Sequence, residues 1–372
     1  MRILAFAYTG GGGDFHPVVA LCLGLRERGH DVSLVCDPDG AEAVSPTGLS
    51  VDGDAPQWSD VAAGGREFSA RIGTSAHPNA TALRIEWLTR RAGMLAPSFT
   101  AAARERRPHV LVSAMMVAPA VRQAATAVAV PWCAVNSTYD TRRDADNPLL
   151  RWIASSMSDA SLLLHATDPV FDDAAARPDE HYVGPMLWES PRDLTPPYLL
   201  VPGPSWALVT VSLVPQGDIA LVPVAQRALS ELGMRSVATI GNLNDAGALG
   251  LMPEGAHLER TISHAAVLER ARLMVGHAGY GSVSKAMWYG VPMVLVPWGR
   301  DQPGVALRVE RLGVARVVRP SELTALPGAI RGVLQDDGYA RRAAEHSRRL
   351  RASDPVRAAC DIIERRFRSA VH

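Results

Sequence analysis

An imidazole, two glycines and a hydroxyl lie close together in residues 277–282, which read His-Ala-Gly-Tyr-Gly-Ser. The glycines at 279 and 281 let backbone N–H groups come close to a ligand, and Ser282 is suited to cap the helix predicted over 282–289. A helix N-terminus attracts anions, because its first N–H groups have no partner inside the helix. We therefore expect these residues to bind a diphosphate.

An acid and an amide follow the short strand predicted over 293–296. Asp301 and Gln302 both have side chains that can hydrogen-bond to adjacent hydroxyl groups. A phosphate site next to a polyol site indicates a nucleotide-sugar as the ligand. As a structural alternative, the same two residues could cap the helix predicted over 303–312.

Short apolar runs alternate with helical patterns along both halves of the chain. The first half has predicted strands at 3–7, 32–36, 110–113 and 132–135 and predicted helices at 18–28, 81–106 and 118–129, and the second half restarts the alternation at 207–213, 222–232 and 235–240. Strands of about five residues separated by helices are typical of parallel, doubly wound sheets. The fold class is therefore predicted to be α/β, with two Rossmann-like domains.

At 372 residues the chain is long enough for two domains. Prolines are dense between residues 185 and 204, where neither a helix interior nor a central strand would accept them. We assign residues 1–190 to an N-terminal domain, 191–204 to a linker and 205–353 to a C-terminal domain. Residues 354–372 form a last segment whose apolar residues recur at helical spacing.

The charge balance and the cysteines argue against several classes of function. The chain has 38 basic and 38 acidic residues, so it lacks the basic excess typical of proteins that bind nucleic acid. No apolar run approaches the ~18 residues of a membrane-spanning helix, and we expect a cytoplasmic protein. The four cysteines are widely spaced and indicate reduced, mostly buried thiols rather than metal ligands or a disulfide frame.

The order of these motifs resembles the donor signature of the family-1 glycosyltransferases of GT-B fold, in particular their bacterial natural-product (antibiotic) branch. The resemblance is carried by residues 277–282, by Gly-Val-Pro at 290–292, by residues 297–302, and by the strand, glycine turn and helix of residues 1–28. It implies two domains facing a cleft, with the C-terminal helix packing back on the N-terminal domain. It also implies inverting, metal-independent transfer of a sugar from a UDP or dTDP donor to a small natural-product acceptor, an aglycone or a glycoside. We expect a monomer or homodimer that needs no cofactor besides the nucleotide-sugar.

Glycosyl transfer needs a base that deprotonates the acceptor hydroxyl while it attacks the sugar. The resemblance places this base at Asp14, three residues before Pro17. A carboxylate with an ordinary pKa near ~4 is a weak base, so burial would have to raise its pKa. His16 is the competing candidate, because the ordinary pKa of histidine already suits neutral pH. As a structural alternative, Asp14 caps the first helix and His16 lies at the surface.

The resemblance implies a role in donor binding for a further set of residues. His277 would stabilise the departing diphosphate together with Gly279, Gly281 and Ser282. Asp301 and Gln302 would hold sugar hydroxyls. The nucleobase would lie along Ile262 and His264. Ala278 stands where relatives usually have glycine, and we expect the turn to survive if φ at this residue is negative. The sequence shows no cluster of carboxylates and histidines that would indicate a catalytic metal.

The acceptor is expected near residues 52–79, a polar and weakly periodic segment that we predict to be a mobile loop. Five side chains fall in segments that would face the acceptor, and each is a candidate contact: Trp58, Phe68, Trp87, Met115 and Tyr139. The structural alternative for each of them is packing in the core.

Three departures from the family pattern bear on the site. Residues 113–115 are Ser-Ala-Met where many relatives have an aspartate that pairs with the base, so Asp14 is expected to act alone. Leu213 and Val214 stand where relatives have a glycine and a hydroxyl residue in contact with the diphosphate, and Val305 stands where they often have asparagine. Three nearby side chains could compensate: Lys285, Trp298 and Arg300.

Three other functions stay open from the sequence. A nicotinamide dehydrogenase would use the first glycine turn and Asp37 at the end of the second strand, but Phe15 occupies the third glycine position of its fingerprint. A nucleotide-sugar epimerase would share the fold and the donor site. A non-catalytic, degenerate glycosyltransferase that serves as a partner protein is favoured by the changes at 213, 214, 278 and 305.

Overall fold

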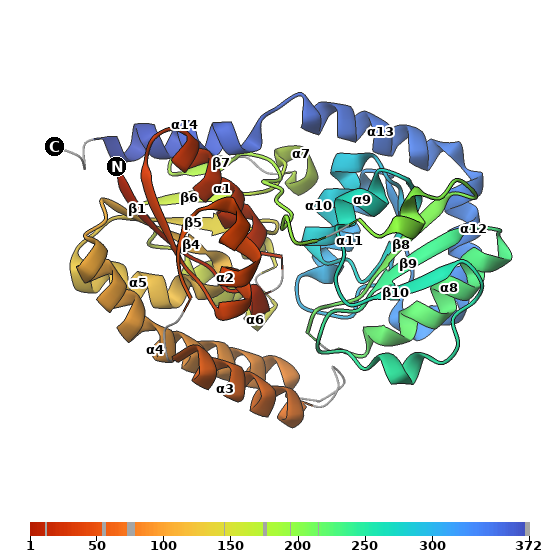
Figure 1. The fold of residues 1–372 in the computed structure, drawn as a ribbon, viewed down its shortest axis with the longest axis horizontal. Helices are drawn as coiled ribbons and strands as arrows, with labels where there is room; N and C mark the ends of the chain where they lie inside the picture. The colour runs from red at the N-terminus through yellow and green to blue at the C-terminus, as the bar shows by residue number, and fades with distance from the viewer. Residues whose placement is uncertain are drawn as a thin grey trace. The chain divides into compact units, whose positions relative to one another are not determined.

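The computed structural model describes residues 1–372 except 12, 54–56, 73–78, 145, 174–176, 194, 215 and 369–372. The chain forms two compact units, which can be followed along the ribbon in Figure 1. Residues 1–191 and 354–372 make up the first unit, and residues 192–353 make up the second.

A parallel sheet forms the centre of the first unit. Its described strands are β1 (Arg2–Phe6), β2 (Asp31–Val35), β3 (Ser50–Asp52), β4 (Val110–Ala114), β5 (Trp132–Asn136), β6 (Leu162–His165) and β7 (Glu180–Tyr182). They lie in the order β3-β2-β1-β4-β5-β6-β7, and each neighbouring pair is parallel. Strands β4 and β5 are buried along their whole length, as expected where helices cover both faces of a parallel sheet. The strand order reverses between β1 and β4.

The described helices of the first unit are α1 (Phe15–Glu27), α2 (Pro38–Val44), α3 (Gln57–Ile72), α4 (Ala80–Arg106), α5 (Ala118–Val128), α6 (Pro148–Ser156), α7 (Pro169–Asp172) and α14 (Pro355–Phe367). Short 3₁₀ turns lie at η1 (Thr9–Gly11), η2 (Ser45–Thr47), η3 (Met115–Val117) and η4 (Thr141–Arg143). The long helix predicted over 81–106 is confirmed as α4.

Helix α3 corrects one prediction. Residues 57–72 lie within the segment predicted as a mobile loop, whereas residues 54–56 and 73–78 of that segment fall outside the described residues. Two adjacent glycines, Gly64 and Gly65, weaken the helical signal of the sequence. Packing stabilises the helix instead, because α3 lies alongside α4 (Figure 1) and Gly64 lies directly against the ring of Trp87.

The C-terminal helix α14 packs on α1, the first helix of the chain (Figure 1). Gly24 leaves room for this contact, because a Cβ atom there would lie 2.4 Å from Cγ1 of Val356. Arg28 donates to Asp361 at 2.6 Å and to Glu364 at 3.1 Å, and His30 lies 2.9 Å from Glu364. Small side chains and ion pairs thus join the two ends of the chain within the first unit.

The second unit contains a second parallel sheet. Its described strands are β8 (Trp206–Thr210), β9 (Arg235–Thr239), β10 (Ala256–Glu259), β11 (Ala271–Gly276), β12 (Met293–Leu295) and β13 (Ala315–Val317), in the order β10-β9-β8-β11-β12-β13. Its helices are α8 (Leu221–Glu231), α9 (His264–Leu268), α10 (Tyr280–Tyr289), α11 (Gln302–Arg311), α12 (Leu326–Gln335) and α13 (Asp337–Arg351), with 3₁₀ turns η5 (Pro197–Leu200), η6 (Asp218–Ala220), η7 (Ala246–Leu249) and η8 (Pro320–Ala325). The strand order reverses between β8 and β11, so this sheet is also doubly wound.

The proline-rich segment predicted as a linker packs within the second unit from residue 192 onward. Arg235, the first residue of β9, donates from Nε to the Pro204 carbonyl and from Nη1 to the Val201 carbonyl, both at 2.8 Å. The Tyr198 hydroxyl donates to Glu259 at 2.8 Å. These bonds hold the proline-rich segment, which contains the 3₁₀ turn η5, against strands β9 and β10.

All four cysteines lie in the described part of the chain, where they are buried and unpaired, as predicted. Within the same residues, no helix combines the length and the apolar character needed to cross a membrane.

Candidate active site

Asp14 lies between the end of β1 and the start of α1, and its side chain is 2% exposed. Its Oδ2 accepts a 2.9 Å hydrogen bond from the backbone N–H of Met116. Although Asp14 occupies the N-cap position of α1, its side chain makes no capping hydrogen bond to that described helix. The predicted structural alternative is therefore wrong for this residue. Its second oxygen, Oδ1, is buried and has no hydrogen-bond partner among the described residues.

Burial raises the pKa of Asp14 to about 6. The Met116 N–H and the guanidinium of Arg91 oppose this change, and Asp37 adds to it. A carboxyl group with a pKa near the working pH can both hold and release a proton under those conditions. The burial that the sequence argument required of this base is present.

Arg91 was not predicted to be part of the site. It projects from α4, is only 3% exposed, and donates from Nη2 to the Met116 carbonyl. Its guanidinium also lies 5.0 Å from the centre of the Tyr8 ring. Met116 thus bonds Arg91 through its carbonyl and Asp14 through its N–H. The available signal was an arginine within the otherwise apolar buried face of a long helix.

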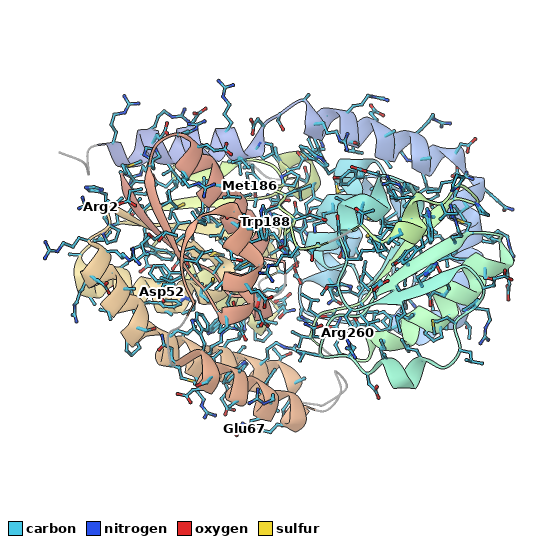
Figure 2. The ribbon with its side chains drawn as sticks, in the orientation of Figure 1. Arg2, Asp52, Glu67, Met186, Trp188 and Arg260 are labelled. Atoms are coloured by element: carbon cyan, nitrogen blue, oxygen red, sulfur yellow. The ribbon has the colours of Figure 1, made fainter. Side chains whose placement is uncertain are left out.

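His16 is turned toward a different segment of the first unit. Its Nδ1 lies 3.0 Å from the carbonyl oxygen of Trp188, and the two rings are 5.7 Å apart. Figure 2 labels Trp188 beside α1. His16 is half-buried rather than fully at the surface. Its role as a competing base stays a prediction.

The predicted acceptor contacts fall into three groups. Trp58 is 4% exposed and stacks on Tyr8 at 5.6 Å, and the same Tyr8 ring lies 5.0 Å from the Arg91 guanidinium. Phe68 and Trp87 stack on each other at 6.3 Å between α3 and α4. Met115, which is 8% exposed, begins the turn η3 next to the residue that bonds Asp14.

Tyr139 corrects the prediction of an acceptor contact. Its side chain is completely buried, and its hydroxyl donates to the carboxylate of Asp144. The core alternative therefore holds for this residue, because a fully enclosed ring offers no surface to a ligand.

In the second unit, His277 follows the end of β11 and is 9% exposed. Its Nδ1 lies 3.4 Å from the Thr210 carbonyl oxygen at the end of β8. A Cβ atom on Gly279 would lie 2.4 Å from the Nε2 atom of His277, so only glycine lets the imidazole approach the backbone there. Burial lowers the pKa of His277, Arg300 lowers it further, and Asp218 raises it.

Two details of this turn differ from the predictions. Ala278 has φ +65°, so the condition of a negative φ is not met, and the turn forms with alanine in the left-handed region. Helix α10 starts at Tyr280 with Gly279 at its N-cap, so Ser282 is its third residue and does not cap it. The N–H of Ser282 instead donates to the Gly279 carbonyl at 3.1 Å, and the Gly281 carbonyl accepts from the Ser284 hydroxyl at 3.0 Å. A left-handed residue before the cap lets the chain turn sharply enough to start the helix earlier.

The loop after β12 is built around Gln302, which is 2% exposed. Its Oε1 accepts from the N–H groups of Trp298 at 2.9 Å and Gly299 at 3.2 Å, and its carboxamide also pairs with that of Gln216. A sugar contact by Gln302 stays a prediction, and the sugar would have to share these bonds. Asp301 occupies the N-cap of α11 without a side-chain capping bond to that described helix. The cap alternative therefore does not describe Asp301.

The residues predicted to lie along the nucleobase are enclosed. Ile262 is 7% exposed, and Ser263 caps α9 by accepting from the Ala266 N–H at 3.1 Å. His264 Nε2 lies 3.1 Å from the Thr239 hydroxyl. Burial lowers the pKa of His264 to about 3, so this ring is neutral near pH 7. Its stacking on a base stays a prediction.

Asp218 is a second buried acid that was not predicted. It is fully buried in η6, and its Oδ2 accepts from the Ser212 N–H at 2.6 Å and from Gln216 Nε2 at 3.0 Å. These bonds shape the loop that follows β8, next to the end of β11. Nothing in the local sequence signals this role, because the loop has no periodic pattern.

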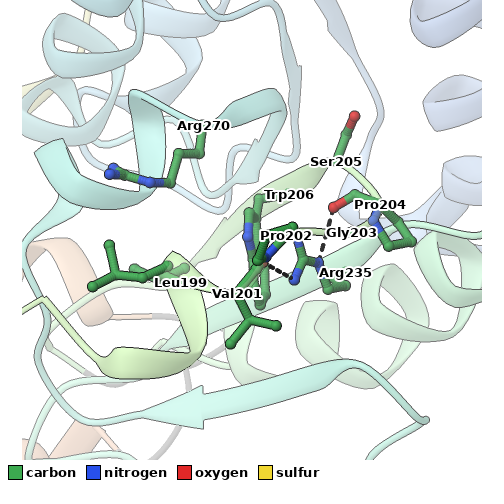
Figure 3. A pocket seen from close by; sticks show the side chains of 10 residues that line it. Leu199, Val201, Pro202, Gly203, Pro204, Ser205, Trp206, Arg235 and Arg270 are labelled. Carbon is green, nitrogen blue, oxygen red and sulfur yellow. Dashed lines mark hydrogen bonds between the residues drawn. The ribbon is translucent and has the colours of Figure 1, made fainter.

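A cavity of about 400 Å³ lies elsewhere in the second unit, at the proline-rich segment (Figure 3). It is lined by Trp206 and Arg235, which are the first residues of β8 and β9, and the guanidinium of Arg235 lies 4.3 Å from the Trp206 ring. Ligands of doubly wound sheets bind at the opposite, carboxyl edge. We therefore do not assign the donor to this cavity.

Comparison with known sequences agrees with the donor signature. Residues 258–356 match the glycosyltransferase family 28 C-terminal domain. The 4'-demethylrebeccamycin synthase of Lentzea aerocolonigenes is 32% identical over 192 residues, which cover 50% of this chain and 45% of that protein. An uncharacterized UDP-glucosyltransferase of Bacillus subtilis (strain 168) is 25% identical over 56% of this chain and 52% of its own length. The chain thus spans about half the length of these relatives. An uncharacterized glycosyltransferase of Mycobacterium tuberculosis is 27% identical over the whole of both chains.

Comparison with solved structures identifies the fold. The glycosyltransferase of kitacinnamycin superposes with a TM-score of 0.74 at 22% identity, covering 98% of each chain. The glycosyltransferase VinC in complex with dTDP gives a TM-score of 0.73 at 20% identity, covering 99% of this chain and all of the other. The chain has the GT-B fold, so the predicted fold is confirmed. The resemblance to antibiotic glycosyltransferases is confirmed with it.

Proposed function

We propose that this chain is a glycosyltransferase that moves a sugar from a UDP- or dTDP-linked donor to a small natural-product acceptor. One observation carries the proposal: the Asp14 carboxyl group is buried, has a pKa raised to about 6, and leaves Oδ1 without a partner among the described residues. Such a carboxylate can take a proton from a hydroxyl near neutral pH. The family 28 match and the relatives of the antibiotic branch support the same reaction.

On the acceptor side, Asp14 acts as the general base. Its Oδ1 takes the proton of the acceptor hydroxyl while the hydroxyl oxygen forms a bond to the anomeric carbon of the sugar. The bond from that carbon to the diphosphate oxygen breaks on the opposite face, so the configuration inverts. The Met116 N–H holds Oδ2 and so fixes the direction of the carboxylate. Met115 precedes the residue whose N–H binds Asp14, and Trp58 stacks on Tyr8, so we propose both as acceptor contacts.

On the donor side, the diphosphate binds where His277 and Gly279 meet the N-terminus of α10. Helix N–H groups and a protonated imidazole stabilise the charge that develops on the leaving group, and we propose that no metal is required. Asp301 hydrogen-bonds to sugar hydroxyls, and Ile262 with His264 borders the base. The complex of VinC with dTDP supports a nucleoside diphosphate as the leaving group.

The test is the isosteric substitution Asp14→Asn. We expect the release of UDP or dTDP in the presence of an acceptor panel to fall by about 10²–10⁴-fold, the range for a lost general base. Affinity for the nucleoside diphosphate should stay unchanged, because the proposed role of Asp14 is to take a proton from the acceptor hydroxyl and not to bind the diphosphate. Unchanged turnover would remove Asp14 as the base and favour His16.

The alternatives make different predictions for the same preparation. A dehydrogenase would use Asp37 to bind ribose, but both carboxylate oxygens of Asp37 bond to Thr9. An epimerase would convert the donor sugar without any acceptor. A non-catalytic partner protein would show no turnover with any acceptor in the panel, and the strained Ala278 would then mark a site that has lost its function.

A further inference from the structure

Arg300 adopts an unusual backbone conformation for its residue type. It lies in the loop between β12 and α11 with φ +60°, in the left-handed region that favours glycine. Such a conformation costs about 1–2 kcal/mol for a residue with a side chain, so other contacts must hold it in place. The neighbouring Gly299 could have taken this conformation without that cost. A specific position of the Arg300 side chain is therefore maintained against local strain.

The guanidinium of Arg300 reaches the loop that follows β8. Nη2 donates to the Ser212 hydroxyl and to Oε1 of Gln216, both at 2.6 Å, and Nε donates to the same Gln216 oxygen at 3.1 Å. In strand order, β11 lies between β8 and β12. The side chain thus crosses the carboxyl end of β11, which His277 directly follows. Because Asp218 anchors both Ser212 and Gln216, the guanidinium is held by a buried framework.

The charge of Arg300 has no ionic partner within the described part of the chain. Its hydrogen bonds to described residues all go to neutral oxygens, and no described carboxylate forms an ion pair with it. Burial lowers the pKa of Arg300, and the negative charges of Asp301 and Asp218 raise it. Nη1 makes no hydrogen bond to any described residue and is therefore available to a ligand. Arg300 is half-buried, and an anion that binds to it would add an ion pair that the described residues do not provide.

The position of Arg300 identifies the kind of anion. Ligands of doubly wound sheets bind at the carboxyl edge where the strand order reverses, which in this sheet is between β8 and β11. His277 at the end of β11 is nine-tenths buried, its Nε2 lies against Gly279 at the start of α10, and Arg300 is close enough to lower its pKa. An arginine, an imidazole and a helix N-terminus therefore border the same region of the edge.

We infer that Arg300 binds the diphosphate of the donor and supplies the contact that Leu213 and Val214 do not make. This inference rests on the proposed function and names a further binding residue for it. The planar guanidinium can donate two parallel bonds to phosphate oxygens, which a lysine ammonium group cannot. Ser212 and Gln216 act as positioning residues, because they set the direction of the remaining N–H groups of Arg300.

The test measures binding of UDP, UMP and uridine by calorimetry, or of the thymidine series if dTDP binds better. The variants are Arg300→Gln, Arg300→Lys and, as a control, Arg311→Gln, which removes an equal charge from the exposed end of α11. We expect Arg300→Gln to weaken UDP binding by about 10- to 100-fold, the value of a lost charge-assisted bond. The affinity of Arg300→Gln for uridine should equal that of the original chain. The UDP affinity of Arg300→Lys should lie between those of Arg300→Gln and the original chain, and the UDP affinity of Arg311→Gln should equal that of the original chain.

Each other outcome overturns a stated part of the argument. Equal UDP binding by Arg300→Gln and the original chain excludes a phosphate contact. If Arg300→Gln loses affinity for UDP and for uridine by the same factor, Arg300 has a purely structural role in the loop. A thermal unfolding curve for each variant separates such a local effect from a general loss of stability. If Arg300→Gln does not fold, Arg300→Lys serves as the test. A UDP affinity of Arg300→Lys equal to that of the original chain excludes two parallel bonds from the guanidinium to phosphate oxygens. If the original chain binds no nucleoside diphosphate, the proposed function itself fails.

Discussion

The backbone N–H of Met116 donates a 2.9 Å hydrogen bond to Oδ2 of Asp14, although 102 positions separate the two residues in the sequence. The bond joins the loop after β4 to the start of α1. The family resemblance led us to look for an aspartate side chain in this loop, where residues 113–115 are Ser-Ala-Met. Here the main chain of that loop holds the carboxylate itself, which leaves Oδ1 available to accept a proton.

The pH dependence of turnover should follow the ionisation of Asp14. The pKa of this group is raised to about 6, and only its ionised form can accept a proton. We therefore expect kcat/KM to rise as the pH increases through about 6 and to become constant above it, since this parameter reports the free enzyme. The profile should be recorded with a saturating donor and a limiting acceptor. A rate independent of pH from about pH 5 to pH 8 would contradict the role of Asp14.

Replacement of Arg91 should shift the pH profile of kcat/KM. The positive charge of Arg91 lowers the pKa of Asp14, so Arg91→Gln should shift the acidic limb of kcat/KM to higher pH. The variant also loses the bond to the Met116 carbonyl, which weakens the support of the carboxylate. Arg90→Gln is the matched control, because Arg90 is the next residue of α4 and its side chain is 57% exposed. An unshifted limb in Arg91→Gln would show that Arg91 has only a structural role.

Ala278→Gly should stabilise the protein. Ala278 has φ +65°, and removing its Cβ should relieve strain of about 1–2 kcal/mol, part of which is offset by the greater entropy of glycine in the unfolded chain. We expect a net gain of about 0.5–1 kcal/mol in the free energy of unfolding, measured in urea. Ala286→Gly, inside α10, should instead destabilise by about 1 kcal/mol. A loss of stability in both variants would disprove strain at residue 278.

His277→Ala should weaken the binding of UDP or dTDP by about tenfold or more. Nδ1 of His277 faces the Thr210 carbonyl, so a bond from Nε2 to phosphate requires the protonated ring. Because the pKa of the free ring is lowered, the ring must take up a proton on binding, so affinity for the diphosphate should fall as the pH rises above that pKa, and less so in His277→Ala. Calorimetry at several pH values tests this, with His346→Ala on α13 as the control. Equal affinity of the two variants would place the phosphate site elsewhere.

Gly24→Ala should destabilise the packing of α14 on α1. The added Cβ would lie 2.4 Å from Cγ1 of Val356, so the C-terminal helix would have to move. We expect a loss of about 1–3 kcal/mol in the free energy of unfolding. Gly93→Ala is the matched control, because a Cβ atom there has open space and alanine favours a helix, so it should stabilise by about 0.5–1 kcal/mol. Similar effects of the two substitutions would refute the tight contact.

The sequence by itself determined the elements and the order in which they recur. Buried strands such as β4 and β5 are continuous apolar runs, and α4 has a long helical pattern, so local composition was enough to predict them. The residues after β11 and β12 were recognised as candidate site residues because they form short motifs at the carboxyl ends of two strands, where ligands of such sheets bind. Asp14 was proposed through the family resemblance, which places the base three residues before Pro17.

The tertiary structure alone decided which side chains support the site. Arg91 lies far from Asp14 in sequence, and Arg300 reaches Ser212 across 88 positions, so no local pattern could reveal either contact. The helical state of α3 depends on its packing against α4, and the left-handed φ of Ala278 is imposed by the turn that brings His277 over Gly279. Propensity and periodicity describe neighbours along the chain. Burial, pKa and strain arise from neighbours in space, which only the folded chain brings together.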